Sequence, residues 1–197
     1  MHLTSNLTAY VERKLYTLNT GHAITAYLGS LHNLPTIVAA IQHPAIQHVV
    51  RGAMHESGAA LLCKYPGLFT EADHAAYIDT IQTRFMNPNI SDDVARVGRE
   101  PLRKLGRSDR LLGPAYMARE YGLPIDHLAR GIAAAMLYDN AEDPQAVEVR
   151  AKVESLGKER AVAEMTGFEE GSVEYGKVLV AYRELEVLKD RTSQASL

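Results

Sequence analysis

Three polar residues near the N-terminus have the types and the spacing of a proton-transfer site. Lys14 is followed by Asn19 and His22, at five and eight positions. In a helix that turns about 100° per residue, the three side chains lie within an arc of about 140° and can face one ligand. A half-buried lysine with a lowered pKa can accept the proton of an alcohol while an amide and an imidazole hold the same oxygen. The spacing alone equally fits a surface lysine and a hydrogen-bonded core histidine.

A second candidate group is cationic and surrounds Pro101 and Gly106. Its six members are Arg96, Arg99, Arg103, Lys104, Arg107 and Arg110. Arginine forks match phosphate, and a bent segment can aim several of them at one small anion, so the segment predicts a phosphate pocket. The alternative is a solvated basic loop paired with Asp92, Asp93, Glu100 and Asp109. Nucleic-acid binding is not expected, because no aromatic residues alternate with these cations.

The usual metal and nucleotide motifs are incomplete in this sequence. His43, His48 and His55 share one segment, but Ala59 stands where a second zinc ligand would follow His55, so we expect no metal site. Cys63 is the only cysteine, which excludes a disulfide within the chain, and its apolar neighbours predict a buried, inert thiol. No glycine-rich turn follows a strand, so we expect no dinucleotide binding by this chain alone.

Helices are expected to position these residues, because apolar side chains recur at helical spacing and no segment alternates as a strand does. The sequence therefore predicts one all-α domain. A helix over about 7–28 should bury the row Val11, Leu15 and Leu18, and Pro44 should open another that runs to Lys64. A capping box at Thr70 should start a third helix, ending near residue 85.

Further helices are expected in the second half of the chain. Ser108 is predicted to cap a helix that closes at Gly122, and Asp126 to cap the next one, which buries Ile132 and Met136. The segments from Pro144 onward carry dense charge, which is typical of solvated outer faces. We expect an ordered domain over residues 1–190, with a last helix near 172–188, and a disordered tail over 191–197.

The overall composition is that of an ordinary globular protein. The 197 residues are 46% hydrophobic and 23% charged, with a net charge of −3 and a pI near 6.2. This charge argues against a general nucleic-acid or acidic-membrane surface. No leader-like segment and no run of about 18 apolar residues is present, so the sequence predicts a cytoplasmic protein without a membrane partner.

Taken together, the residues from Glu12 to Ala23 resemble the signature of the polyol-specific long-chain dehydrogenases, a lysine followed by an asparagine and a histidine at five and eight positions. Other segments resemble the mannitol-1-phosphate 5-dehydrogenase branch of that family in order and spacing. They are Gly52-Ala53-Met54, Glu56-Ser57-Gly58, Arg84-Phe85, Asn87-Pro88, Asp92-Asp93-Val94, Arg96-Val97-Gly98-Arg99, Pro101-Leu102-Arg103-Lys104-Leu105 and Glu120-Tyr121-Gly122-Leu123-Pro124. The resemblance covers about residues 8–190.

The resemblance implies a multi-helical substrate-binding domain, like the C-terminal domain of 6-phosphogluconate dehydrogenase-type enzymes. It implies that Lys14 is the general base, that Asn19 and His22 bind and polarise the reacting oxygen, and that Arg96, Arg99, Arg103 and Lys104 contact the substrate. In the complete enzyme, mannitol 1-phosphate and fructose 6-phosphate would be interconverted with NAD. The N-terminal Rossmann domain of the family, which binds NAD and supplies a further catalytic asparagine, has no counterpart in this sequence. The chain alone should therefore be inactive.

One departure from the family pattern is His55, which stands where an acidic residue is usual.

Two other functions stay open at this point. One is the corresponding half of a hexuronate reductase of the fructuronate type. The other is a non-catalytic helical interaction module, which the intact Lys14, Asn19 and His22 disfavour.

Overall fold

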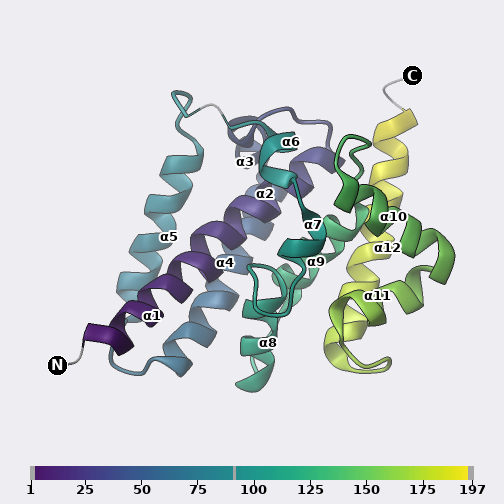
Figure 1. The fold of residues 1–197 in the computed structure, drawn as a ribbon. Helices are drawn as coiled ribbons and strands as arrows, with labels where there is room; N and C mark the ends of the chain where they lie inside the picture. The colour runs from purple at the N-terminus through teal and green to yellow at the C-terminus, as the bar shows by residue number, and fades with distance from the viewer. Residues whose placement is uncertain (1–2, 91, 195–197) are drawn as a thin grey trace.

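The computed structural model describes residues 3–90 and 92–194, and all regular elements within them are helices. The one β-type contact in that part of the chain is an isolated antiparallel bridge between Thr36 and Asp93. This confirms the all-α class predicted from the apolar periodicity. Figure 1 shows the long N-terminal helices on one side of the molecule and the C-terminal helices on the other, with a short-helix region between them.

The chain begins with three helical segments that follow one another without a break. They are α1 (Leu3–Arg13), the π-helix η1 (Lys14–Asn19) and α2 (Thr20–Leu31). Two hydroxyls support carbonyls of the π turn: Thr20 Oγ1 donates to Leu15 O at 3.2 Å, and the fully buried Ser57 donates to Tyr16 O. Such support is needed because a π turn departs from the regular i→i−4 ladder.

The π turn changes which residues of this long helix are buried. Leu15 and Leu18 are partly buried and pack against the core, but Val11 is 57% exposed. The prediction that Val11 is buried was therefore wrong. It assumed one continuous α-helical row, whereas the π turn rotates the residues before it relative to those after it. Leu7 and Tyr10 are also exposed, at 64% and 52%.

The next helices follow the sequence signals closely. They are α3 (Ile37–Gln42), α4 (Pro44–Lys64) and α5 (Glu71–Phe85). The capping box at Thr70 is present, since Thr70 Oγ1 accepts from Asp73 N at 3.1 Å and the Asp73 carboxylate accepts from Thr70 N at 3.3 Å. Cys63 was predicted to be buried but is exposed. It lies in the last turn of α4, on a surface groove shared with α5.

The middle of the chain contains α6 (Val94–Gly98), α7 (Pro101–Lys104), α8 (Leu112–Glu120) and α9 (Asp126–Leu137). Ser108 does not cap α8, which starts at Leu112 after a series of turns. Gly122 takes a left-handed φ of +66° just beyond the end of α8, as a closing glycine does. Asp126 is the first residue of α9 rather than its cap. Ile132 and Met136 are buried, as predicted.

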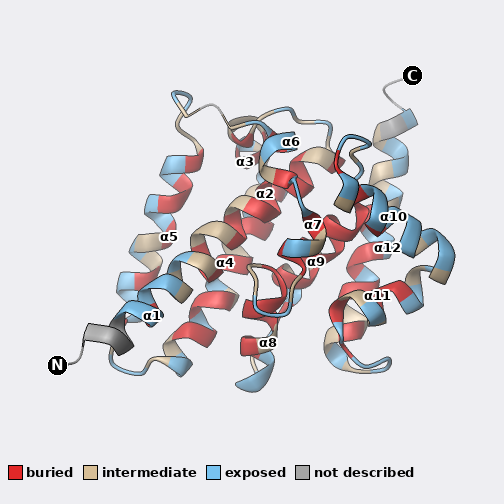
Figure 2. Ribbon diagram, viewed as in Figure 1, coloured by how far each residue is buried: buried red, intermediate tan, exposed pale blue. Residues whose placement is uncertain are grey.

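The C-terminal part consists of α10 (Pro144–Leu156), α11 (Lys158–Thr166) and α12 (Val173–Gln194). Helix α12 continues through residues 191–194, which the sequence placed in a disordered tail, while 195–197 lie outside the described residues. Figure 2 shows that the buried residues concentrate on α2, α4 and α9, whereas α10 is largely exposed. None of the described helices combines the length and the apolar content needed to span a membrane.

Candidate functional site

Lys14 and Asn19 are the first and last residues of the π-helix, and this geometry places them on one side. A π-helix bonds residues five apart, so the interval from Lys14 to Asn19 is about one turn. Asn19 is partly buried, whereas Lys14 is exposed and its side chain has no hydrogen bond or ion pair with the described part of the chain. The half-buried lysine that the chemistry requires is therefore not built by this chain alone.

His22, one turn further along, is enclosed. Its ring stacks on Phe85 of α5, with the centroids 5.0 Å apart and the planes at 22°. Its Nε2 lies 3.2 Å from Asp92 Oδ2. Because a carboxylate only accepts hydrogen bonds, Nε2 carries the hydrogen, and Nδ1 is the acceptor when the ring is neutral.

The charge state of His22 is set by its burial and by the groups around it. Burial lowers the pKa of His22, and the negative charge of Asp92 opposes this effect. The cations Arg96, Lys104 and Arg84 lower the pKa further. Since the ordinary pKa of histidine is about 6.5, the ring is neutral at neutral pH. Because the Nε2 hydrogen is directed at Asp92, the neutral ring offers a substrate only the Nδ1 lone pair, and it can donate to a substrate oxygen only when the Nε2 hydrogen is released from Asp92.

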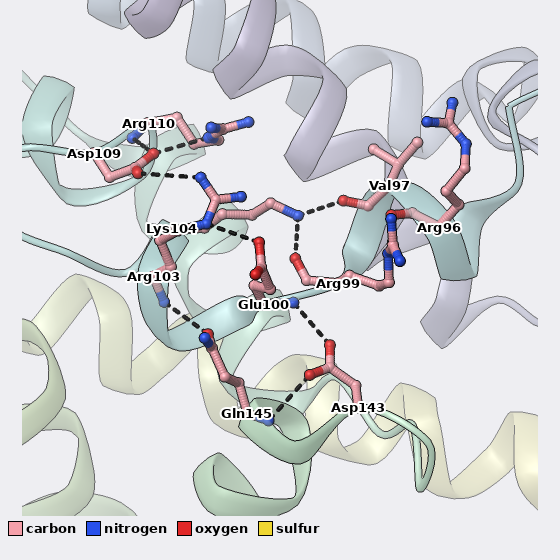
Figure 3. Close-up of polar contacts among 10 residues, drawn as sticks. All are labelled: Arg96, Val97, Arg99, Glu100, Arg103, Lys104, Asp109, Arg110, Asp143 and Gln145. Carbon is pink, nitrogen blue, oxygen red and sulfur yellow. Dashed lines mark hydrogen bonds and ion pairs between the residues drawn. The ribbon is translucent and has the colours of Figure 1, made fainter.

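The cationic segment is partly neutralised by carboxylates, as the solvated-loop alternative predicted. Arg96 is paired with Asp92, and Arg103 Nε lies 2.9 Å from Glu100 Oε2. Arg99 makes only a long contact, from its Nε to Arg96 O at 3.4 Å. Figure 3 shows Arg96 and Arg103 at opposite ends of the segment. The four predicted substrate contacts therefore do not converge on one point.

Lys104 lies inside the segment and is 4% exposed. Its Nζ donates to Val97 O and Arg99 O, at the end of α6 (Figure 3). Burial lowers the pKa of Lys104 to about 8, and the neighbouring Arg110 and Arg103 act in the same direction. The ammonium group caps carbonyls that α6 leaves without a helical partner. In this structure Lys104 thus holds the turn between α6 and α7.

The start of α10 clamps the same segment from outside. Asp143, which is 5% exposed, accepts from Glu100 N at 2.7 Å and from Gln145 N at 3.0 Å. Gln145 Oε1 in turn accepts from Arg103 N at 2.9 Å (Figure 3). Glu100 has a left-handed φ of +60° before Pro101, a conformation that persists only where the surroundings fix it.

Asp92 joins the two predicted groups into one site. One of its carboxylate oxygens contacts His22 and the other contacts Arg96. The sequence offered Asp92 only as a partner of the arginines, and it gave no signal for Asp143 and Gln145, which lie more than forty positions from the residues they hold. Arg84 borders the same small cavity of about 30 Å³ as His22, Phe85 and Asp92.

The chain is similar to known proteins over nearly its whole length. Residues 6–181 match the model of the mannitol dehydrogenase C-terminal domain. A Pseudomonas fluorescens mannitol 2-dehydrogenase, solved as a ternary complex with NAD and D-mannitol, is 21% identical, with a TM-score of 0.75, over 96% of this chain and 41% of that one. A D-sorbitol dehydrogenase in substrate-free form is 18% identical, with a TM-score of 0.73, over 93% of this chain and 40% of that one. The chain thus spans about two fifths of these solved proteins.

Proposed function

Because the chain belongs to the mannitol dehydrogenase C-terminal domain family, we propose that it is the substrate-binding and catalytic half of an NAD-dependent polyol dehydrogenase. The observation that carries the proposal is the π turn, which aligns Lys14 with Asn19 and leads directly to His22. In the proposed reaction Lys14 Nζ accepts the hydroxyl proton of the alcohol. The Asn19 amide donates to the same oxygen as it becomes a carbonyl, and His22 donates to it through Nε2 once this hydrogen is released from Asp92.

NAD, the hydride acceptor in this proposal, would be held by another part of the protein. The described residues contain neither a parallel sheet nor the glycine turn that presents a pyrophosphate, so they do not fit a dinucleotide. The chain's own residues bind the polyol and move its proton. We therefore expect no activity and no NAD binding from the chain alone.

A covering domain over α1 would also give Lys14 the environment that it lacks. Leu7, Tyr10 and Val11 are exposed and precede Lys14 by seven, four and three positions, so they lie on the same face as Lys14. Such an exposed apolar face is typical of a surface that another domain or protein covers. Burial there would lower the pKa of the lysine and make it a better base near neutral pH.

For the substrate, we propose a polyol phosphate, mannitol 1-phosphate, which is converted to fructose 6-phosphate. The support is cationic: Arg84, Arg96 and Lys104 all act electrostatically on His22, so a phosphate near this histidine would enter a positive field. Arg99 and Arg84 have no ion-pair partner in the described part of the chain, which leaves their guanidinium groups available. Arg96 could exchange Asp92 for a dianion.

A hexuronate is the competing substrate class, and one observation favours it. Arg96 and Arg103 already have carboxylate partners, so fewer arginines are available than the sequence suggested. A sugar carboxylate needs only one arginine fork, whereas a phosphate dianion gains from several. The two substrates therefore differ in how many of these cations they require.

The test uses the complete reading frame of the parent gene, and NADH formation or consumption is followed with mannitol 1-phosphate, mannitol, fructose 6-phosphate and fructuronate. Arg99→Ala should reduce kcat/KM for mannitol 1-phosphate by more than about 20-fold, because the exposed guanidinium of Arg99 would be desolvated on binding the phosphate and a charge-assisted contact of that kind contributes about 2 to 4 kcal/mol. Turnover of mannitol, which has no phosphate, should change little. Arg160→Ala, on the exposed side of α11, is the matched control.

Two results would contradict this proposal at different levels. Activity on fructuronate alone would reject the phosphate and keep the dehydrogenase. No NAD-dependent activity on any polyol, sugar phosphate or sugar acid would reject the dehydrogenase itself.

A further inference from the structure

A second group of polar residues lies where α4, α9 and α12 meet, and its centre is His127. Glu56 Oε1 lies 2.9 Å from His127 Nδ1, and the same carboxylate accepts from the backbone of His127 and Leu128, each at 2.9 Å. The Glu56 side chain is only 9% exposed. Because the carboxylate accepts the Nδ1 hydrogen, the neutral ring has its lone pair on Nε2.

Packing against α4 also holds the His127 ring in place. Gly52 of α4 lies directly against it, and a Cβ at this position would be 2.4 Å from the His127 ring. The glycine is therefore required for the ring to rest on the helix. One turn before Gly52, the exposed His48 places its own ring 5.2 Å from that of His127, at an interplanar angle of 71°.

The separation of the two rings suits a shared metal ion. A zinc–nitrogen bond of about 2.1 Å plus an imidazole radius of about 1.1 Å places the ion about 3.2 Å from each ring centre. For an ion bound to a nitrogen of each ring, ring centres 5.2 Å apart would correspond to an angle of about 109° at the ion, which is the tetrahedral value. The carboxylate behind His127 matches the usual second layer of such sites, in which a ligating histidine donates its other ring hydrogen to a carboxylate.

The space beside the rings can hold the remaining ligands. His48, His127 and Asp126 border a surface cavity of about 660 Å³. The two cations on its wall are each paired with a carboxylate, Lys177 with Asp126 at 2.8 Å and Arg130 with Glu184 at 2.6 Å, so a divalent ion would not meet unpaired positive charge. No third histidine, cysteine, aspartate or glutamate converges there among the described residues, so water would complete the coordination.

We propose that His48 and His127 form a binding site for a divalent transition metal ion of the zinc type, with Glu56 as the residue that orients His127. This site is separate from the proposed catalytic residues and does not depend on the proposed function. The sequence analysis expected no metal site because it searched for ligands at short, regular spacings. The two proposed ligands lie 79 positions apart and on different helices, so no such spacing motif includes both. An ion bound there would tie α4 to α9.

The test is calorimetric titration of the untagged full chain with Zn²⁺ at pH 7.5. We expect one Zn²⁺ per chain and a rise in Tm on binding. His48→Gln and His127→Gln should each abolish the one-to-one binding, and Glu56→Gln should weaken it about 10- to 100-fold. The exposed His55 lies on the same helix, so His55→Gln is the matched control and should bind as the wild type does.

The proposal fails if the wild-type chain shows no saturable Zn²⁺ binding, or if binding survives in both histidine variants. Loss of binding in His32→Gln instead would contradict the proposal and move the site to the other close histidine pair, His32 and His43, where no carboxylate of the described residues is hydrogen-bonded to either ring. If His127→Gln does not fold, the exposed His48 decides the question, because its replacement disturbs no buried contact. Unchanged affinity in Glu56→Gln would reject the orienting role of that carboxylate.

Discussion

The two ends of the Lys14 to His22 segment differ in how far this chain completes them. At the first end, Lys14 is exposed beside the exposed Leu7 and Val11. At the other end, only eight positions away, His22 is enclosed by Phe85 and Asp92. The chain therefore builds the oxygen-binding part of the proposed site from its own core. The burial that Lys14 needs as a proton acceptor would have to come from another domain.

The largest expected effect is at the exposed end. In the complete protein, Lys14→Ala should lower kcat by at least about 10²-fold with a smaller change in KM, because a general base acts mainly in the transition state. Steady-state kinetics across the pH range would measure this effect. The stability of the isolated chain should change by no more than about 0.5 kcal/mol, since Lys14 has no partner in it. Near-normal turnover at every pH would make Lys14 an ordinary surface lysine.

The next effect concerns the stability of the cationic segment, whose Lys104 acts electrostatically on His22. Lys104→Met should destabilise the isolated chain by about 1.5 to 3 kcal/mol, because the carbonyls of Val97 and Arg99 lose a charged donor. Urea unfolding measures this change, with the exposed Lys152→Met as control. Unchanged stability together with a raised KM in the complete protein would instead support the sequence prediction that Lys104 contacts the substrate.

A smaller effect is expected on the pKa of His22, and its direction should differ between two variants. Asp92→Asn should lower the pKa of His22 further, and Arg96→Ala should raise it, because these two charges act in opposite directions. NMR titration of the imidazole signals in the isolated chain would show both shifts. Since the folded pKa lies below about 6.5, the stability linked to His22 is complete above that value and is lost as the pH falls through the folded pKa. Equal shifts in both variants would disprove the charge assignment.

The smallest effect is expected at Val11. Val11→Ser should change the unfolding free energy of the isolated chain by no more than about 0.5 kcal/mol, because the side chain is 57% exposed. In the complete protein the same change should weaken activity or domain association if the face of α1 is covered. Ile132→Ala, at a fully buried position, is the contrasting control and should cost about 2 to 5 kcal/mol. A comparable loss for Val11→Ser would restore the burial that the sequence predicted.

Local signals predicted the helices well, and their limits have physical causes. Pro44 and the capping box at Thr70 marked helix starts correctly because both act within one turn of the helix. Val11 was misplaced because apolar periodicity assumes a constant number of residues per turn, and the π turn breaks that constancy. Cys63 was misplaced because an apolar run does not say which side of a helix faces solvent.

For the candidate site, the sequence supplied the residues of the π turn, the cations and the nearby carboxylates that pair with the cations, but not the partners from distant helices. The contact between His22 and Asp92 spans seventy positions, and Glu56 reaches α9 across a similar interval. Such pairs arise from the packing of helices against one another, and a local spacing rule cannot express them. The same limit hid the contacts of Lys104, which the sequence placed in a phosphate pocket or a solvated loop and which the structure buries against carbonyls of Val97 and Arg99.

The hydrogen bonds from Asp143 and Gln145, at the start of α10, to the cationic segment determine the shortest fragment of this chain that could keep the proposed site intact. A fragment that ended at Leu137 would retain Lys14, His22 and every cation from 96 to 110. It would lack Asp143 and Gln145, which hold the backbone of Glu100 and Arg103. Without them, the left-handed turn at Glu100 would lose the hydrogen bonds that hold it from outside the segment, which help to offset its conformational cost. The charged C-terminal helices, which looked like mere outer covering, are thus part of the scaffold that any minimal engineered version must keep.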